Sequence, residues 1–158
     1  MDPIVAVLAE QFKFVHQTLR AEVAGLTPEQ LDYVAAPATN SLDVLVTHIV
    51  GSESEVWMMV AGKQTDRDRA AEFETRGTVA STLLERIDAA DKLIDELAPF
   101  IDAASLGKTF ERLYGPNPKR SGAAWLIGNL AHAREHVGHL QLTKQLFPDH
   151  YPPLAHPW

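Results

Sequence analysis

Apolar residues recur every three or four positions in four long stretches of the chain, separated by segments rich in glycine, proline and charged residues. This period is typical of helices that bury one face, and no stretch alternates in the manner of a strand. Each stretch follows a residue that can cap a helix and ends at or beside a glycine or proline. The four expected helices start after Asp2, Ser41, Thr78 and Ser121 and end near Gly25, Gly62, Pro99 and Phe147.

The connecting segments differ in what they predict. Thr27-Pro28-Glu29-Gln30 has the pattern of a capping box and predicts a short helical turn. Residues 63–77 are polar and predict a connection between helices. Residues 104–120 contain several glycines and prolines, so we expect an ordered connection without a helix or strand of its own. The proline-rich residues 148–158 predict an extended tail.

Four helices of this length predict an all-α fold, a four-helix bundle. The chain of 158 residues is long enough to bury one apolar core, and we expect a single domain over residues 1–158. All connections are long enough to cross an end of the bundle, so their length does not distinguish an up-down-up-down from a crossover topology. Gly128 and Gly138 lie inside the fourth expected helix, where each costs about 1 kcal/mol relative to alanine. We expect close helix packing at both.

Charge and composition restrict the partners of the protein. The net charge is −7, and acidic and basic residues are interleaved rather than gathered into a basic surface, so we expect no nucleic-acid partner. No apolar run is long enough to span a membrane, and the N-terminal segment carries Asp2 and Glu10 where a secretory signal carries basic residues. We therefore expect a cytoplasmic protein. Without cysteine, the chain itself offers no thiolate ligand or cysteine nucleophile.

Three histidines fall within eight residues of the fourth expected helix, at His132, His136 and His139. At about 100° per residue they share one stripe, which we expect to face inward beside Leu140. A buried imidazole carries a donor and an acceptor that both need partners. A metal ion satisfies several rings at once, and an i, i+4 pair places two ring nitrogens within reach of a single ion.

The third metal ligand would come from another helix, and His48 on the apolar face of the second expected helix is the best candidate. Glu55, two turns further on, is expected to support a ligating ring or to be a further ligand. Three neutral nitrogens suit zinc, nickel, cobalt or iron. The alternative is that these histidines are core or capping residues, hydrogen-bonded to carbonyl groups and to Glu55 or Glu135. An i, i+4 pair together with an inward histidine on a second helix favours the metal.

The sequence resembles the DinB-like superfamily in two stretches, THIVGSESEVW around His48 and HAREHVGHL from His132 to Leu140. The superfamily includes transferases and isomerases that use mycothiol or bacillithiol, maleylpyruvate isomerases among them. The resemblance, which extends from the first helix to Phe147, implies an up-down-down-up bundle, frequently a homodimer. It also implies zinc, nickel or a similar ion at one end of an interhelical cleft, held by His48, His132 and His136.

The sequence departs from the DinB-like pattern around the glycine after the last ligand. Many members have arginine and glutamine there, and this chain has Val137 and His139. His139 is therefore expected to be a pocket residue, an alternative ligand or a packing residue.

Three hypotheses about function follow from an ion with three protein ligands. The first is a metal-dependent thiol S-transferase or isomerase, with a low-molecular-weight thiol as cosubstrate and a small-molecule substrate. Lys119 and Arg120 are candidates to bind a carboxylate of either one. The second is a metal-dependent hydrolase in which Glu55 or Glu135 is the general base. The third is a stress-associated, non-catalytic module in which the metal joins two helices.

Overall fold

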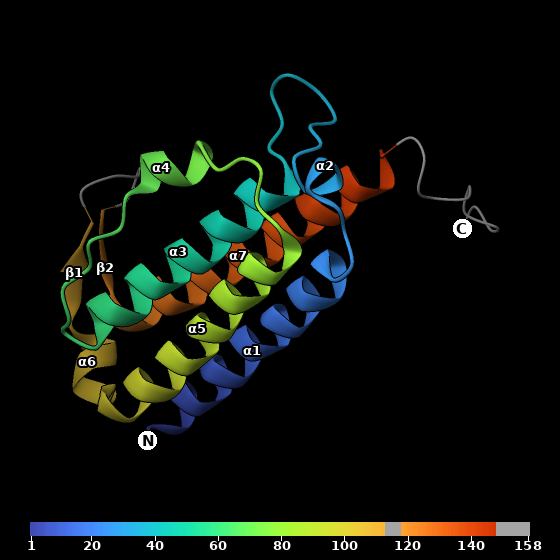
Figure 1. Ribbon diagram of the computed structural model, residues 1–158. Coiled ribbons are helices and arrows are strands. Elements are labelled where there is room, and N and C mark those ends of the chain that lie inside the picture. The colour runs from blue at the N-terminus through green and yellow to red at the C-terminus, as the bar shows by residue number, and fades with distance from the viewer. Residues whose placement is uncertain (113–117, 148–158) are drawn as a thin grey trace, which may run out of the picture.

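The computed structural model describes residues 1–112 and 118–147, and it confirms the all-α four-helix bundle (Figure 1). Four long helices form the bundle, and shorter elements lie between them. The long helices are α1 (Pro3–Val23), α3 (Leu42–Val60), α5 (Ala80–Leu97) and α7 (Gly122–Gln145). The short elements are α2 (Pro28–Leu31), α4 (Arg69–Phe73), the 3-10 helix Ala98–Phe100, α6 (Ala103–Gly107), β1 (Thr109–Glu111) and β2 (Lys119–Ser121).

Local capping explains where several helices start. Asp2 accepts a hydrogen bond from the first turn of α1, and Thr27 and Gln30 form the expected capping box of α2. The expected cap Thr78 is wrong, since α5 begins one residue later with Val79 at the capping position. No side chain caps that end. The start of α5 is therefore stabilised by the packing of its buried face and not by a capping hydrogen bond.

Two apolar clusters, one at each end of the bundle, give the directions of the helices. One cluster joins the first half of α1 and the start of α7 to the ends of α3 and α5, and in it Phe12 packs edge-to-face on Trp57. The other joins the ends of α1 and α7 to the starts of α3 and α5, as Leu19 and Leu83 illustrate. Helices α1 and α7 therefore run one way and α3 and α5 the other, which is the up-down-down-up order.

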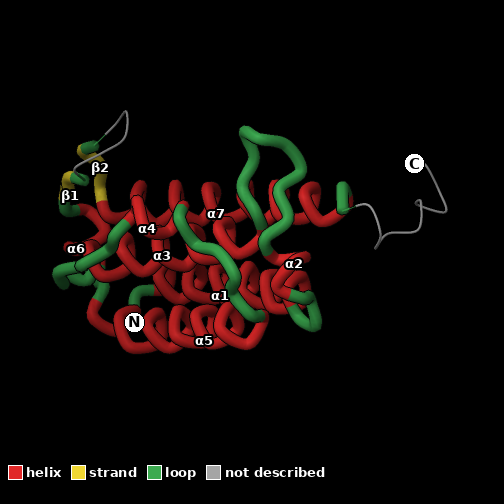
Figure 2. The backbone as a smooth tube through the Cα atoms, turned by 45° about the horizontal axis from the view of Figure 1, so that its top comes forward, coloured by secondary structure: helices red, strands yellow, loops and turns green. Residues whose placement is uncertain are grey.

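The crossover segment, residues 61–79, is a consequence of this order. Because α3 and α5 run in the same direction, the chain must return along the length of the bundle between them, and it does so over α3 (Figures 1 and 2). The segment is more than a polar connection, since it contains α4, whose N-terminus Asp68 caps. Some of its charged side chains are buried in the interior of the protein.

The expectation of no regular element in residues 104–120 is wrong. This part contains α6 and the antiparallel pair β1 and β2, in which Phe110 lies opposite Arg120. Strands of three residues are too short to show a period in the sequence. The expected tail, residues 148–158, lies outside the described residues, and the single domain over residues 1–158 stays a prediction.

The close helix packing expected at two glycines of α7 is also wrong. A side chain added at Gly138 would meet no atom within 4 Å, and at Gly128 it would meet only the guanidinium of Arg120. The tight positions are Gly122, against the backbone of α6, and Gly51, against the carboxylate of Glu72.

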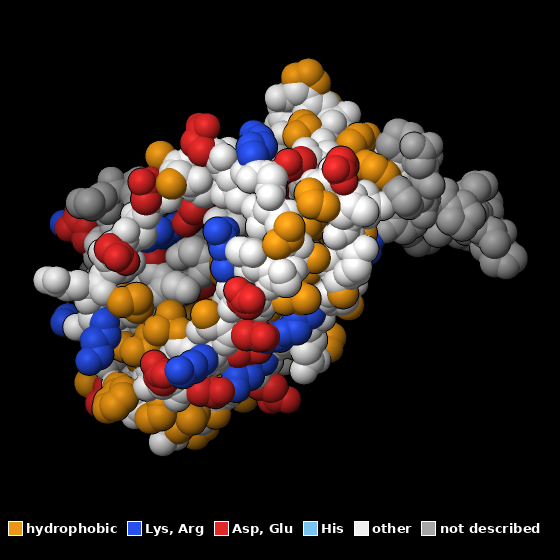
Figure 3. Space-filling view, in the orientation of Figure 1, with side chains coloured by type: hydrophobic (Ala, Val, Ile, Leu, Met, Phe, Trp, Pro, Cys, Tyr) orange, Lys and Arg blue, Asp and Glu red, His pale blue; other side chains and the backbone are white. Residues whose placement is uncertain are grey.

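Acidic and basic side chains are interspersed over α1 and α5 (Figure 3), and some form ion pairs, such as Lys13 with Asp95. Within residues 1–112 and 118–147, no helix combines the length and apolar character needed to cross a membrane.

A buried charged group separates the two apolar clusters. The ring of His16 is fully buried, with Nε2 2.6 Å from Glu53 Oε2 on α3 and Nδ1 2.6 Å from Asp91 Oδ1 on α5. Arg20 donates to the second oxygen of Asp91. Burial alone would lower the pKa of His16, but its hydrogen bonds to the two carboxylates, and their charges, raise the pKa above the ordinary value. His16 is therefore an imidazolium that joins three helices.

We expect His16→Leu to lower the free energy of unfolding by roughly 3–5 kcal/mol, because it leaves the buried Glu53 carboxylate without its partner. The double variant His16→Leu/Glu53→Leu should regain most of that loss. Because the pKa of His16 is raised on folding, its stabilisation is complete below the unfolded value and is lost as pH rises through the folded value. Urea unfolding across neutral and alkaline pH should therefore show a steeper decline for the native sequence than for the double variant. Equal slopes would contradict this assignment.

Candidate metal centre

The three predicted ligands, His48, His132 and His136, come together between α3 and α7. One nitrogen from each ring lies within 4.8 Å of the other two. His48 Nε2 is 3.1 Å from His132 Nε2, and the centroids of the His132 and His136 rings are 4.3 Å apart. Two nitrogens bound to one zinc ion at about 2.0–2.1 Å lie about 3–3.4 Å from each other. The nitrogens of His48 and His132 already have the spacing of two ligands of one small cation, and the group of three histidines could hold such an ion.

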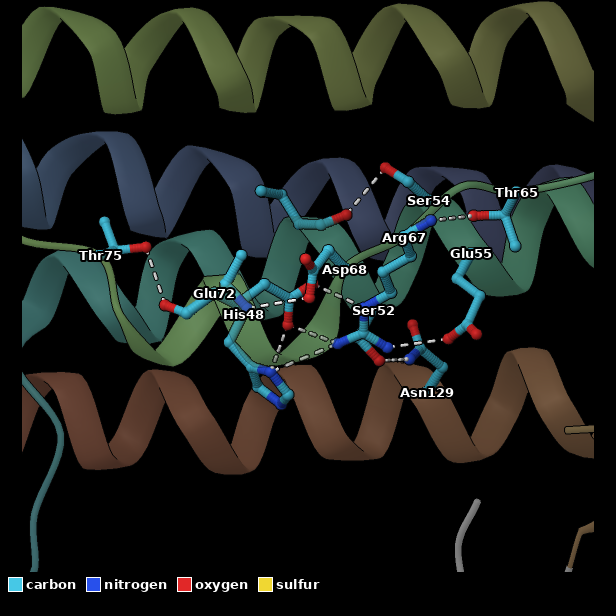
Figure 4. Close-up of polar contacts among 12 residues, drawn as sticks. His48, Ser52, Ser54, Glu55, Thr65, Arg67, Asp68, Glu72, Thr75 and Asn129 are labelled. Carbon is cyan, nitrogen blue, oxygen red and sulfur yellow. Dashed lines mark hydrogen bonds and ion pairs between the residues drawn. The ribbon is translucent and has the colours of Figure 1, made fainter. Parts of the chain in front are cut away.

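The helices place these rings through ordinary packing. His48 lies one turn beyond Leu45 on the buried face of α3, and its ring extends from α3 to α7 (Figure 4). His132 and His136 are one turn apart on α7 and are half-buried. Because α3 and α7 pack along their length, the turn of α3 that carries His48 lies against the turn of α7 that carries His132 and His136.

Glu72 of α4 lies beside the ring of His48. Its Oε2 atom is 2.8 Å from His48 Nδ1. A carboxylate only accepts hydrogen bonds, so the Nδ1 proton points to Glu72 and the Nε2 lone pair faces the other rings. His139 contacts His136 on the same helix, with the two Nδ1 atoms 3.2 Å apart. When His136 donates in this bond, its Nε2 lone pair is the one left for an ion.

Arginine side chains surround this carboxylate and the next one along α3. Arg67 donates through Nε to Glu72 Oε1 at 2.6 Å and through Nη1 to Glu55 Oε2 at 2.8 Å (Figure 4). Arg112, directly after β1, also donates to Glu55. Burial alone would raise the pKa of Glu72, but Arg67 and His48 hold it below its ordinary value. Glu72 is therefore ionised at neutral pH.

Burial and mutual repulsion keep two of the imidazoles neutral. Burial is the main cause that lowers the pKa of both His132 and His136 to about 4, and charge on the neighbouring histidines adds to it. A histidine binds a metal only through an unprotonated nitrogen. At neutral pH both rings are uncharged, so each has one unprotonated nitrogen.

The other predicted site residues have different places. Glu55 is buried but lies between two guanidinium groups and outside the group of ligand nitrogens. Glu135 is exposed on α7, where its charge acts on His132. His139 is exposed, so the expected inward stripe of three histidines is wrong at this position. Lys119 on β2 pairs with Glu111 on β1.

Four residues around the rings were not predicted from the sequence, namely Arg67, Glu72, Arg112 and Asn129. The first three come from connecting segments, where no period identifies a buried charge. Asn129 precedes His132 by one turn and donates to Ser52, one turn after His48. The one available signal was Gly51, a glycine inside a helix, which leaves space for Glu72.

In the metal-free protein, we expect His132 and His136 to titrate with pKa values of about 4 and not near 6.5, which NMR titration of the imidazole resonances measures. The pKa of each is lowered on folding, so between these values the unfolded chain binds more protons. The free energy of unfolding should therefore fall as pH drops through that window. His132→Ala/His136→Ala should reduce the fall, and an unchanged pH dependence would contradict the assignment.

Comparisons with known proteins agree with this picture. The profile of the DinB superfamily matches residues 11–140. In structure the chain is similar to "the conserved protein of locus" from Enterococcus faecalis, with a TM-score of 0.73 and 15% identity over 92% of this chain and 97% of that one. At this identity the likeness shows the fold alone. A search of curated proteins found no match.

Proposed function

This chain belongs to the DinB superfamily, and on that premise we propose that it binds one divalent metal ion through His48, His132 and His136 and uses it in transfer or isomerisation with a low-molecular-weight thiol. The convergence of three imidazole nitrogens within 4.8 Å carries the proposal. Zinc and nickel are the ions we favour, since both accept neutral nitrogen ligands.

The donor set fits such an ion. His132 and His136 are neutral at neutral pH, and Glu72 holds the proton of His48 on the far side of its ring. A divalent ion with three protein ligands keeps a further position for a small molecule, and it lowers the pKa of a thiol or water bound there. The chain has no cysteine, so the thiol would come from a cosubstrate.

The surroundings of Glu55 favour thiol transfer over hydrolysis. A hydrolase needs a general base to take a proton from water. Both Arg67 and Arg112 donate to Oε2 of the Glu55 carboxylate, so this oxygen is already engaged by two guanidinium groups. Glu135, the other candidate base, is exposed on α7. A thiol with a lowered pKa is itself the nucleophile and needs no such base.

The ligand count favours a reactive site over a structural one. A structural zinc site usually has four protein ligands. In the part of the chain that the structure describes, the group has three. This difference supports an ion that accepts a small-molecule ligand.

We expect His136→Ala to abolish stoichiometric metal binding while the helical content is kept, because two nitrogens hold an ion far less tightly than three. His139→Ala provides the matched comparison one turn away. It should keep about one ion per chain at saturation, since His139 contacts His136 and is not in the ligand group. Metal content by mass spectrometry and circular dichroism measure both effects. Full occupancy in His136→Ala would remove His136 from the ligand set.

The thiol hypothesis predicts a response of the cobalt-substituted protein to small thiols. Titration should change the visible absorption of cobalt and saturate, as expected when sulfur enters the coordination sphere, whereas equal concentrations of an alcohol analogue should not. An unchanged spectrum, together with a large loss of thermal stability on chelation, would favour the non-catalytic module.

We also propose a homodimer. Apolar side chains that are more than half exposed follow one another along α1 at Ile4, Val7 and Phe14, and Ile127 on α7 is similarly exposed. Exposed apolar surface on neighbouring helices of this kind is typical of subunit contacts.

A further inference from the structure

Glu72 sits in a space that a glycine of α3 provides. An added Cβ at Gly51 would overlap the Oε1 atom of Glu72. Glycine in the middle of a helix costs about 1 kcal/mol relative to alanine. At this position the missing side chain lets the carboxylate lie directly against α3, one turn from His48.

Arg67 holds this carboxylate from the other side. Its Nε and Nη2 atoms donate to the two oxygens of Glu72 at 2.6 and 2.7 Å, and the side chains of both residues are less than a tenth exposed. Paired hydrogen bonds of this type fix the plane of a carboxylate. The crossover segment thus supplies both the carboxylate of Glu72 and the guanidinium of Arg67 that holds it.

Glu72 also prevents a second arrangement of the His48 proton. Arg67 Nη2 lies 3.3 Å from His48 Nδ1. Arginine only donates, so if it were the partner of Nδ1 the ring proton would move to Nε2. The Nε2 lone pair that faces His132 would then be lost. Glu72 therefore decides which nitrogen of His48 can bind a metal.

We propose that Glu72, seated on Gly51 and clamped by Arg67, is a positioning residue of the metal centre that keeps His48 in the tautomer able to bind the ion. The proposal rests on metal binding by the three histidines. It makes the crossover segment part of the metal site, although no metal ligand lies in it. Arg67 and Glu72 also line a hollow of about 610 Å³ between the crossover segment, α3 and α5. On their other side both residues contact His48. Figure 3 shows the face of the molecule into which this hollow opens.

Gly51→Ala tests the proposal without touching a charged group. Gly138→Ala is its matched control, because it makes the same change inside the other ligand-bearing helix, where the new methyl group meets no atom. Both should gain helix propensity. We expect zinc affinity, measured by chelator competition, to fall 10- to 100-fold in Gly51→Ala and in Glu72→Ala, and to stay within twofold in Gly138→Ala.

The tautomer provides a readout that a merely structural role would not change. Long-range ¹H–¹⁵N NMR of the metal-free protein should show the His48 proton on Nδ1 in the native sequence. It should lie on Nε2 in Glu72→Ala, where no acceptor is left at this position and Arg67 is the remaining partner of Nδ1. Native affinity and an unchanged tautomer in Glu72→Ala would overturn the proposal. If the native protein binds no zinc, the proposed function fails, and the NMR result still decides whether Glu72 sets the tautomer.

Discussion

A histidine inside a helix bundle keeps its place only while both ring nitrogens have partners, and this requirement organises the interior of the protein. His16 has a carboxylate on each side, so its ring carries a proton on both nitrogens and joins α1, α3 and α5. His48 has a carboxylate on one side and another imidazole on the other. Its ring is therefore suited to donate a lone pair. The same side chain forms a charged link in one layer and a candidate metal ligand in another because its partners differ.

Much of the bundle could be predicted from the sequence because its information is local. The four helices follow from a period that each stretch carries within itself, and the DinB-like motifs supplied the helix order that connection lengths left open. His48, His132 and His136 were predicted because an i, i+4 pair needs no knowledge of the fold. His139 shows the limit of this prediction. The angles between residues place it on the same stripe as His132 and His136, but they do not say how much of that stripe the neighbouring helix covers.

The rest depends on contacts between residues distant in sequence. Arg67 and Glu72 belong to a segment with the composition of a solvated connection, and they are buried only because that segment lies on α3. The pair of strands β1 and β2 is short and local in sequence. It nevertheless places Arg112 against Glu55, which is 57 residues away. No period in the sequence reports a charge that is buried by pairing, so these residues become visible only in the structure.

The helix order explains how such residues reach the metal centre at all. In an up-down-up-down bundle, short loops connect neighbouring ends and never pass the middle of a helix. Here α3 and α5 run in the same direction, so the chain must travel the length of the bundle between them. His48 lies on the helix that this return path crosses, and Gly51 gives the path a place to touch it. The topology requires a long connection between α3 and α5 only to cover the distance between their ends. The same connection can therefore also carry side chains that orient a metal ligand. This is why the chemistry of the site depends on a segment outside the four helices.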